Sequence, residues 1–180
     1  MLKAGRGGMQ HGFTLVELMT AVLVLGLLVT LGLPQMQTFV QNAKFRNTAD
    51  SIQNGLQLAR NEATRRNGRV QFLISPGGAW SVQAVDAAGT VLETIQKRSK
   101  GEGSDGVTLT LTPASASSIT FTAFGRTASQ YSDGLPVSNL TRIDIANSGA
   151  TKQFRIDVGS AGQIRMCDPA VTNTADPRKC

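Results

Sequence analysis

The stretch Gly12-Phe13-Thr14-Leu15-Val16-Glu17-Leu18 opens an apolar run that continues to Leu33. Counting histidine as neutral, Glu17 is the only charged side chain between Arg6 and Lys44. A carboxylate inside a membrane-length apolar segment costs about 2.5–3.5 kcal/mol, so by default it marks a functional site. We therefore expect Glu17 to meet a positively charged partner, and a second N-terminus of the same kind would supply one.

The apolar run has the length of a membrane-spanning helix. Residues 13–33 number 21, and at ~1.5 Å per residue they would cross a hydrocarbon core of ~30 Å. A secretory signal peptide would have an apolar core of about 7–15 residues and a small-residue cleavage site. Lys3 and Arg6 precede the run, which favours a cytoplasmic N-terminus and an exported remainder. A plain anchor fits the hydropathy but leaves Glu17 and the Gly12–Phe13 junction unexplained.

This junction and its carboxylate resemble the processing and assembly signature of the type IV pilin superfamily. The resemblance implies that a prepilin peptidase removes residues 1–12 by cutting between Gly12 and Phe13, and then methylates the new N-terminal nitrogen of Phe13. It also implies that Glu17 neutralises the N-terminal amine of a neighbouring subunit and sets the filament register. Opposite charges attract strongly in a low-dielectric environment, and each avoids isolated burial by pairing.

The helix is predicted to continue to about Arg66, with residues 13–34 in the membrane and residues 35–67 amphipathic. Pro34 lies where many of these pilins carry a helix-interrupting proline, and it predicts a kink or a melted segment. An apolar stripe at spacings of three and four is expected to pack on the head beyond Lys44 and on neighbouring helices before it. The stripe comprises Met36, Val40, Ala43, Ile52, Leu56, Ala59 and Ala63.

The predicted helix ends in a cluster of arginines, Arg60, Arg65 and Arg66, followed by Asn67-Gly68. Cations in a last turn interact favourably with the helix dipole, and Gly68 is predicted to be the left-handed cap. Nucleic-acid binding is the less favoured interpretation of these arginines.

Residues 68–180 predict a β-rich head, because short strand-like runs alternate with turn signals. Ser75–Gly78 and Asp86–Gly89 are expected to form hairpin turns, while 101–106 and 129–139 are expected to be loops. The fold class is therefore α+β, a long N-terminal helix packed on a small antiparallel β-sandwich. The expected strands are 69–75, 79–85, 90–96, 107–112, 119–124, 142–146, 153–158 and 163–167.

Composition excludes several kinds of chemistry. Lysine and arginine number 18 against 12 acids, a net +6; removing Lys3 and Arg6 leaves 16 against 12, or +4, which indicates solubility and weak polyanion affinity. The only histidine, His11, would leave with the first 12 residues, so the mature chain would lack a histidine base or metal ligand. No Walker-type loop is present. We expect a non-enzymatic protein without a cofactor or metal.

The two cysteines, Cys167 and Cys180, lie near the end of a chain that is expected to be exported. Such a pair predicts a disulfide. A metal site is the less favoured interpretation, because two thiolates underfill a tetrahedral zinc shell.

Within the superfamily, the head resembles the GspH/FimT group. The similar residues are Leu58–Ala63, Arg66, Val70, Trp80, Ile119–Arg126 and Gly162–Cys167. The resemblance implies a minor pseudopilin of type II secretion or a minor pilin of the FimT/FimU type, and the cysteine pair favours the pilus branch. It implies a single-pass inner-membrane protein with its head in the periplasm. Implied partners are other minor pilins or pseudopilins, the major pilin, the prepilin peptidase and the inner-membrane assembly platform.

Some FimT-type members bind DNA through a C-terminal Gly-Arg-x-Arg motif. The corresponding Gly162-Gln163-Ile164-Arg165 lacks the first arginine. Contacts to phosphates would add salt-dependent affinity without base specificity, and a solvated basic edge is the alternative interpretation. The candidate DNA-binding residues are Arg165, Arg178, Lys179, Lys152 and Arg155.

Overall fold

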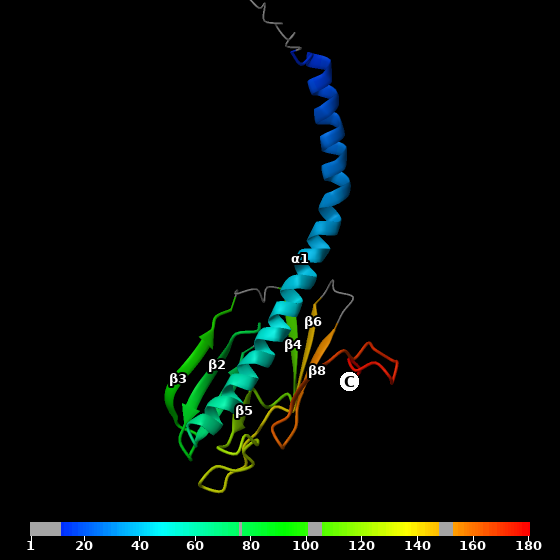
Figure 1. Cartoon of the computed structure of the whole chain (residues 1–180). Helices are drawn as coiled ribbons and strands as arrows, with labels where there is room; N and C mark the ends of the chain where they lie inside the picture. The colour runs from blue at the N-terminus through cyan, green and yellow to red at the C-terminus, as the bar shows by residue number, and fades with distance from the viewer. Residues whose placement is uncertain (1–11, 76, 101–105, 148–152) are drawn as a thin grey trace, which may run out of the picture. The chain divides into compact units, whose positions relative to one another are not determined.

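The computed structural model describes residues 12–75, 77–100, 106–147 and 153–180, with only the backbone described at 31–35, 37 and 38 (Figure 1). The chain divides into two compact units, Met1–Phe39 and Val40–Cys180, which are described separately. Residues 1–11 of the predicted leader, Lys152 and residues 101–105 of the predicted 101–106 loop lie outside the described residues.

One helix, α1 (Leu15–Arg65), accounts for 51 residues. Its backbone is helical at Pro34, so the chain is not melted there; the kink at this proline stays a prediction. No helix in the described parts of the chain is both long and apolar enough to cross a membrane.

The C-terminal end of α1 corrects one detail of the sequence prediction. Asn67, with φ of 50°, is the left-handed residue, and Gly68 is not. The Gly68 amide donates to the Ala63 carbonyl at 3.1 Å, which satisfies one of the carbonyls that a helix end leaves without a partner. Asparagine tolerates the left-handed region better than most residues, so it occupies the position that glycine usually takes.

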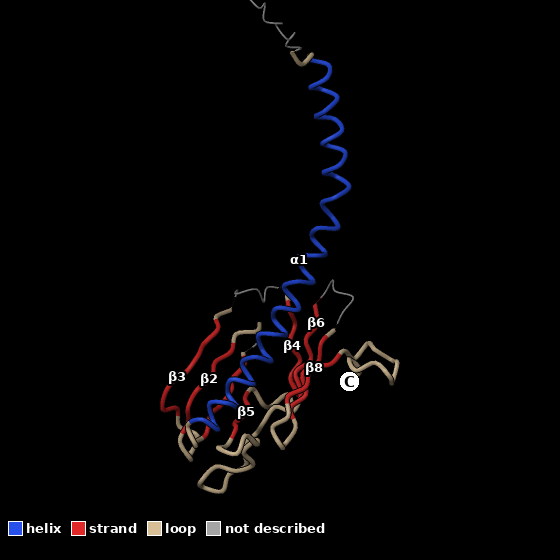
Figure 2. The backbone as a smooth tube through the Cα atoms, viewed as in Figure 1, coloured by secondary structure: helices blue, strands red, loops and turns tan. Residues whose placement is uncertain are grey.

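Two four-stranded antiparallel sheets form the rest of the head (Figure 2). The first has the order β3-β2-β1-β5, and the second has the order β4-β6-β7-β8. The fold class is confirmed. The strands are β1 (Arg69–Ile74), β2 (Trp80–Val85), β3 (Val91–Arg98), β4 (Val107–Thr112), β5 (Ser118–Phe121), β6 (Arg142–Asn147), β7 (Phe154–Val158) and β8 (Ile164–Cys167).

The predicted strand at 119–124 is too long at its end. β5 stops at Phe121 because the chain turns at Thr122, whose carbonyl accepts from the Gly125 amide at 2.8 Å. Gly125 adopts φ of 69° there, a conformation that side chains disfavour. β3 differs in the opposite sense and runs two residues beyond the predicted end, to Arg98.

The core lies between α1 and both sheets. Burial on α1 begins at Phe45, whose ring stacks on Phe154 of β7 with centroids 5.1 Å apart. Met36, 68% exposed, and Val40 remain on the surface. The apolar stripe therefore divides near Lys44, as the sequence predicts. Its buried members are Ile52, Leu56, Ala59 and Ala63.

α1 approaches the first sheet closely at Gly55. A Cβ atom built on this glycine would lie 2.8 Å from Phe72 Cε2 and 3.2 Å from two atoms of the Trp80 ring. The centroids of the two rings are 5.7 Å apart, and Trp80 Nε1 donates to Ser51 Oγ at 3.1 Å. Two aromatic rings therefore fill the space that any larger residue at position 55 would need.

Gly55→Ala is expected to destabilise the protein by about 1–3 kcal/mol, the usual cost of overpacking a core. Alanine is intrinsically better in a helix than glycine by about 1 kcal/mol, so propensity opposes the expected effect. The measurement is the free energy of unfolding in denaturant. Gln57→Ala, at an exposed position of the same helix, is the control and should change it little; equal stability of the two variants would contradict the packing argument.

Candidate functional site

The N-terminal end of α1 is capped by Thr14. Its Oγ1 accepts from the Glu17 amide at 3.2 Å, and its carbonyl accepts from the Leu18 amide at 3.2 Å. A threonine followed three residues later by a glutamate is the sequence signal of a helix start, and the sequence prediction overlooked it. The helix therefore begins at Leu15, two residues later than predicted, and Gly12–Thr14 form a short non-helical segment before it.

The two residues to which the sequence assigns assembly chemistry are exposed. Phe13 is 84% exposed, and Glu17 lies on the surface of the first turn. No ion pair to the Glu17 carboxylate forms within the described residues. The carboxylate and the ring are thus both available to another chain. The apolar residues that follow are exposed as well: Leu18, Met19, Val22, Leu23, Val24, Leu25, Leu27 and Leu28.

The C-terminal arm, residues 167–180, is closed by the predicted disulfide between Cys167 and Cys180, whose Cα atoms are 5.0 Å apart. Cys167 is buried at the end of β8. The Asp168 amide donates to the Arg178 carbonyl at 2.7 Å, so the two ends of the arm also meet through the main chain. The disulfide prediction is confirmed.

Arg165 of β8 and Arg178 of the arm both make contacts within the chain. Arg165 Nη2 donates to the Lys179 carbonyl at 2.6 Å. Arg178 Nη2 lies 2.7 Å from Asp176 Oδ2. Hydrogen bonds from Arg178 are the main cause that lowers the pKa of Asp176 to about 2. Both arginines therefore have a structural role that explains them without a ligand.

The neighbouring strands contain two matched ion pairs. Arg155 Nε lies 2.6 Å from Asp144 Oδ1, and Arg142 Nε lies 3.0 Å from Asp157 Oδ1. Each pair joins directly opposite residues of β6 and β7, the arrangement in which opposite charges stabilise a sheet. The sequence analysis missed both acids as partners. Among the described candidates for DNA binding, Arg155, Arg165 and Arg178 are thus engaged, and DNA binding stays a prediction.

The arginine cluster at the end of α1 is organised around Glu62. Its carboxylate lies 2.6 Å from Arg65 Nη2 and 2.9 Å from Arg66 Nε. These hydrogen bonds, Arg65 first, lower the pKa of Glu62 to about 2. Arg66 also reaches Glu93 of β3 at 2.6 Å, and Arg60 Nε donates to the Gly125 carbonyl at 3.2 Å. The cluster fastens the helix end to β3 and to the turn that follows β5.

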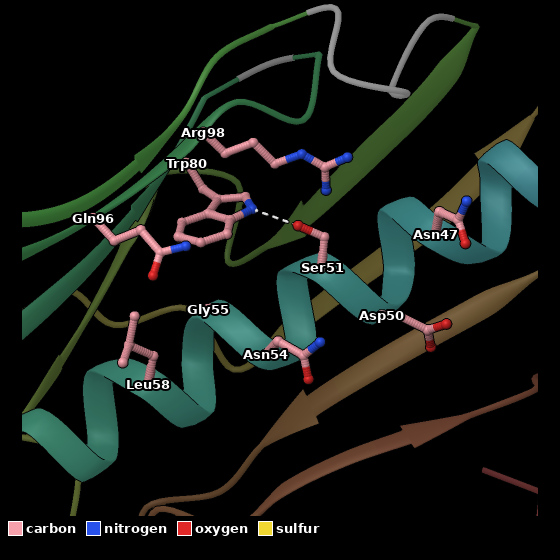
Figure 3. A pocket seen from close by; sticks show the side chains of 9 residues that line it. All are labelled: Asn47, Asp50, Ser51, Asn54, Gly55, Leu58, Trp80, Gln96 and Arg98. Atoms are coloured by element: carbon pink, nitrogen blue, oxygen red, sulfur yellow. Dashed lines mark hydrogen bonds between the residues drawn. The ribbon is translucent and has the colours of Figure 1, made fainter.

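A polar groove separates α1 from β3 (Figure 3). It has a volume of about 550 Å³. One wall is a helix face of small polar side chains, and the other is the end of β3. Sequence reasoning missed this groove, because its two walls are more than 30 residues apart and only the fold brings them together. The lining residues are Asn47, Asp50, Ser51, Asn54, Gly55, Leu58, Trp80, Gln96 and Arg98.

Comparison with known families decides the classification. A family model described as type II transport protein GspH matches residues 48–162. The chain belongs to the GspH family. A second model, the prokaryotic N-terminal methylation motif, matches residues 8–33, which include Gly12, Phe13 and Glu17. Both matches agree with the resemblance found in the sequence.

Solved structures share the GspH-family fold. The type IV minor pilin FimU of Pseudomonas aeruginosa is 20% identical with a TM-score of 0.55, and the match covers 75% of this chain and 99% of FimU. The minor pseudopilin EpsH of the type 2 secretion system of Vibrio cholerae is 15% identical with a TM-score of 0.51, covering 71% of this chain and 99% of EpsH. No curated protein matches the sequence.

Acid is expected to weaken the attachment of the helix end. The pKa of Glu62 is lowered in the folded state from 4.5 to about 2, so its contribution to stability is present above the unfolded pKa and is lost as the pH falls toward 2. Unfolding measured from pH 6 to pH 2 should show this loss, and Glu62→Gln should remove that part of the pH dependence. Asp133→Asn, a change in an exposed loop, is the control and should retain it.

Proposed function

We propose that this protein is a non-enzymatic minor subunit of a type IV pilus or of a type II secretion pseudopilus, which enters the filament through its N-terminal helix. Family and fold are those of structural pilins. The observation that carries the proposal is the N-terminal arrangement, in which a methylation motif places exposed Phe13 and Glu17 at the start of α1.

Processing would take place at the Gly12–Phe13 bond. This bond lies in the non-helical segment before the Thr14 cap. Among the described residues, no atom beyond the chain neighbours lies within 4 Å of a Cβ built on Gly12. Gly12 and Phe13 are both exposed, which supports cleavage at this bond. Cleavage by a prepilin peptidase followed by N-methylation would leave Phe13 as the first residue.

Assembly would then depend on Glu17. An unpaired carboxylate in an apolar surface is costly, and the N-terminal amine of a neighbouring subunit would neutralise it in the filament. The exposed apolar residues of α1 would be covered by neighbouring helices in the same step. Before assembly, the helix would anchor the chain in the inner membrane with the head in the periplasm, where the assembly platform would extract it.

Neither branch of the family is favoured by the site itself. FimU is described as a type IV minor pilin and EpsH as a minor pseudopilin of type 2 secretion, and this chain shares a fold with both. The confirmed disulfide agrees with the pilus branch. The engaged arginines of the C-terminal arm give no specific support to DNA binding, so we do not add it as a second function.

Deleting the gene in its host is expected to reduce either surface piliation or secretion into the medium, because a priming subunit is needed before the filament grows. Electron microscopy for pili and enzyme assays on culture supernatant would read out the two outcomes. Restoration by the wild-type gene is the control. Normal piliation and normal secretion in the deletion strain would contradict the proposal.

Replacing Glu17 with alanine is expected to leave cleavage after Gly12 intact and to abolish incorporation into the filament. The physical reason is that the neighbouring amine loses its only compensating charge in an apolar setting. Immunoblotting of sheared filaments and mass spectrometry of the N-terminus would measure the two steps.

Thr20→Ala is the matched control, since within the described part of the chain the Thr20 hydroxyl donates to the Glu17 carbonyl of its own helix, at 2.9 Å. This variant should be processed and incorporated normally. Normal incorporation of Glu17→Ala would overturn the role given to the carboxylate.

A further inference from the structure

Phe124 is the most exposed large apolar side chain that the structure describes, with 88% of its surface open to solvent. It lies in the turn that follows β5, where the Gly125 amide donates to the Thr122 carbonyl at 2.8 Å. Single exposed apolar residues are common on protein surfaces and need no explanation by themselves. Phe124 differs from them in the rigidity of its turn and in the match between its chemistry and a pocket elsewhere on the head.

The turn is held in place by α1 and by the connection between β7 and β8. Arg60 Nε of α1 donates to the Gly125 carbonyl at 3.2 Å. The Thr127 amide donates to the Ser160 carbonyl at 3.2 Å. A Cβ atom on Gly162 would overlap the Gly125 carbonyl, so the two turns pack directly on each other. A side chain on a rigid turn loses little freedom on binding, which makes the exposed ring a preorganised anchor.

A small pocket lies between Arg46 of α1 and the beginning of the C-terminal arm. Its volume of about 200 Å³ is below the range of about 300–1,000 Å³ that small-molecule sites occupy, so it has room for a single side chain. Phe154 is half-buried there and stacks on Phe45, with ring centroids 5.1 Å apart. The apolar part of the lining is Phe154, Met166 and Cys167, and the charged part is Arg46, Asp168 and Arg178.

The charges at the pocket leave one carboxylate without a partner. Arg46 Nε lies 3.8 Å from Asp50 Oδ2, and Arg178 Nη2 lies 2.7 Å from Asp176 Oδ2. Asp168 makes no ion pair within the described residues. The lining residues and their ion-pair partners are thus two arginines and three aspartates, a net charge of −1. A cation is therefore the favoured neighbour for whatever side chain enters.

The turn of Phe124 supplies such a cation. Arg126 is exposed two residues after Phe124 and makes no ion pair in the part of the chain that the structure describes. Its charge would neutralise the pocket when the ring is inserted. Guanidinium groups also pack favourably on aromatic faces, so Arg46 and Arg178 at the pocket suit a phenyl ring. The two surfaces are complementary in shape class and in charge.

The ring cannot enter the pocket of its own chain. Its turn is bonded to Arg60, whereas the pocket lies at Arg46. These two arginines are 14 positions apart on one helix, which separates them by about 21 Å along its axis. Since both the turn and the pocket are fixed to this helix, another molecule must supply the ring.

We propose that Phe124 of one copy of this protein inserts into the pocket at Arg46 of a second copy, with Arg126 beside Asp168. The contact joins two different surfaces, so each bound pair retains one free ring and one free pocket. Heterologous contacts of this kind repeat along an open chain. The contact involves the head alone and does not require Glu17, so it and the assembly role of the N-terminal helix fail separately.

A photo-cross-link locates the contact in the full-length protein in detergent. A benzophenone amino acid in place of Phe124 is expected to attach to Met166 or Phe154 of another copy on illumination. The acceptor is an isotope-labelled copy that carries Phe124→Ala, and mass spectrometry identifies the joined residues. The cross-link should persist, because the acceptor contributes its pocket and not its ring. The same group in place of Leu135, which is exposed on another loop, should not reach Met166.

Phe124→Ala is expected to weaken self-association at least about tenfold, as the loss of a central aromatic anchor does. Sedimentation velocity over a range of protein concentrations measures this effect. Leu135→Ala also removes an exposed apolar side chain and is the matched control, which should change self-association little. Both variants should unfold at the denaturant concentration of the wild type, and Glu17→Ala should self-associate like the wild type.

Exchanging charges tests the ion pair. Arg126→Asp and Asp168→Arg are each expected to weaken self-association at least about threefold, a modest effect typical of exposed charges. An equal mixture of the two variants should recover the wild-type affinity, because each supplies the intact half that the other lacks. Asp168 Oδ1 accepts from the Ala170 amide at 2.9 Å, so Asp168→Asn, which keeps an acceptor, separates the loss of charge from a disturbed arm. Asp133→Arg is the charge control.

Several outcomes would overturn the proposal. These are the absence of an intermolecular cross-link, equal losses in Phe124→Ala and Leu135→Ala, and a mixture that associates no better than its components. A cross-link between the Phe124 turns of two copies would replace the proposed contact with a symmetric one. Attachment to detergent alone, without a protein acceptor, would replace it with a turn that inserts into membranes.

Discussion

The head depends on one packing constraint, which is that α1 must bury its apolar face against two sheets that share no strand. Ile52 and Leu56 lie at the centre of this contact and are fully buried. Gly55 lies between them in the chain and lets the Phe72 and Trp80 rings approach the helix backbone. Because the interior is closely packed, the helix cannot slide or rotate without opening a void.

The same helix serves two purposes along its length. Beyond Lys44 it is a core element, and the acid-arginine cluster around Glu62 fastens its end to β3. Before Lys44 the large apolar side chains that the structure describes are exposed. A surface of this kind needs a partner or a membrane. The division explains how one continuous helix joins a stable head to a segment built for assembly with other chains.

Charge shows a similar division between structure and function. The arginines of the C-terminal arm and of β6 and β7 have carboxylate or carbonyl partners at hydrogen-bonding distance. The sequence alone made some of them candidates for DNA binding, because the pairing of β6 with β7, which brings Asp144 and Asp157 beside these arginines, is not evident from local sequence. The role of a charged side chain therefore depends on the residues that the fold places beside it.

The sequence by itself determined the α+β class, the eight strands, the cysteine pair and the N-terminal processing signature. Each of these depends on residues close together in the chain, or on a period that one element repeats. The helix start at Leu15 could also have been predicted from the sequence, since Thr14 and Glu17 have the spacing of a helix cap. Only the tertiary structure decided the ion pairs across β6 and β7, the exposed edge of β3 and the groove against Asn54. These join residues far apart in the chain, and their spacing obeys no local rule, because long-range packing sets it.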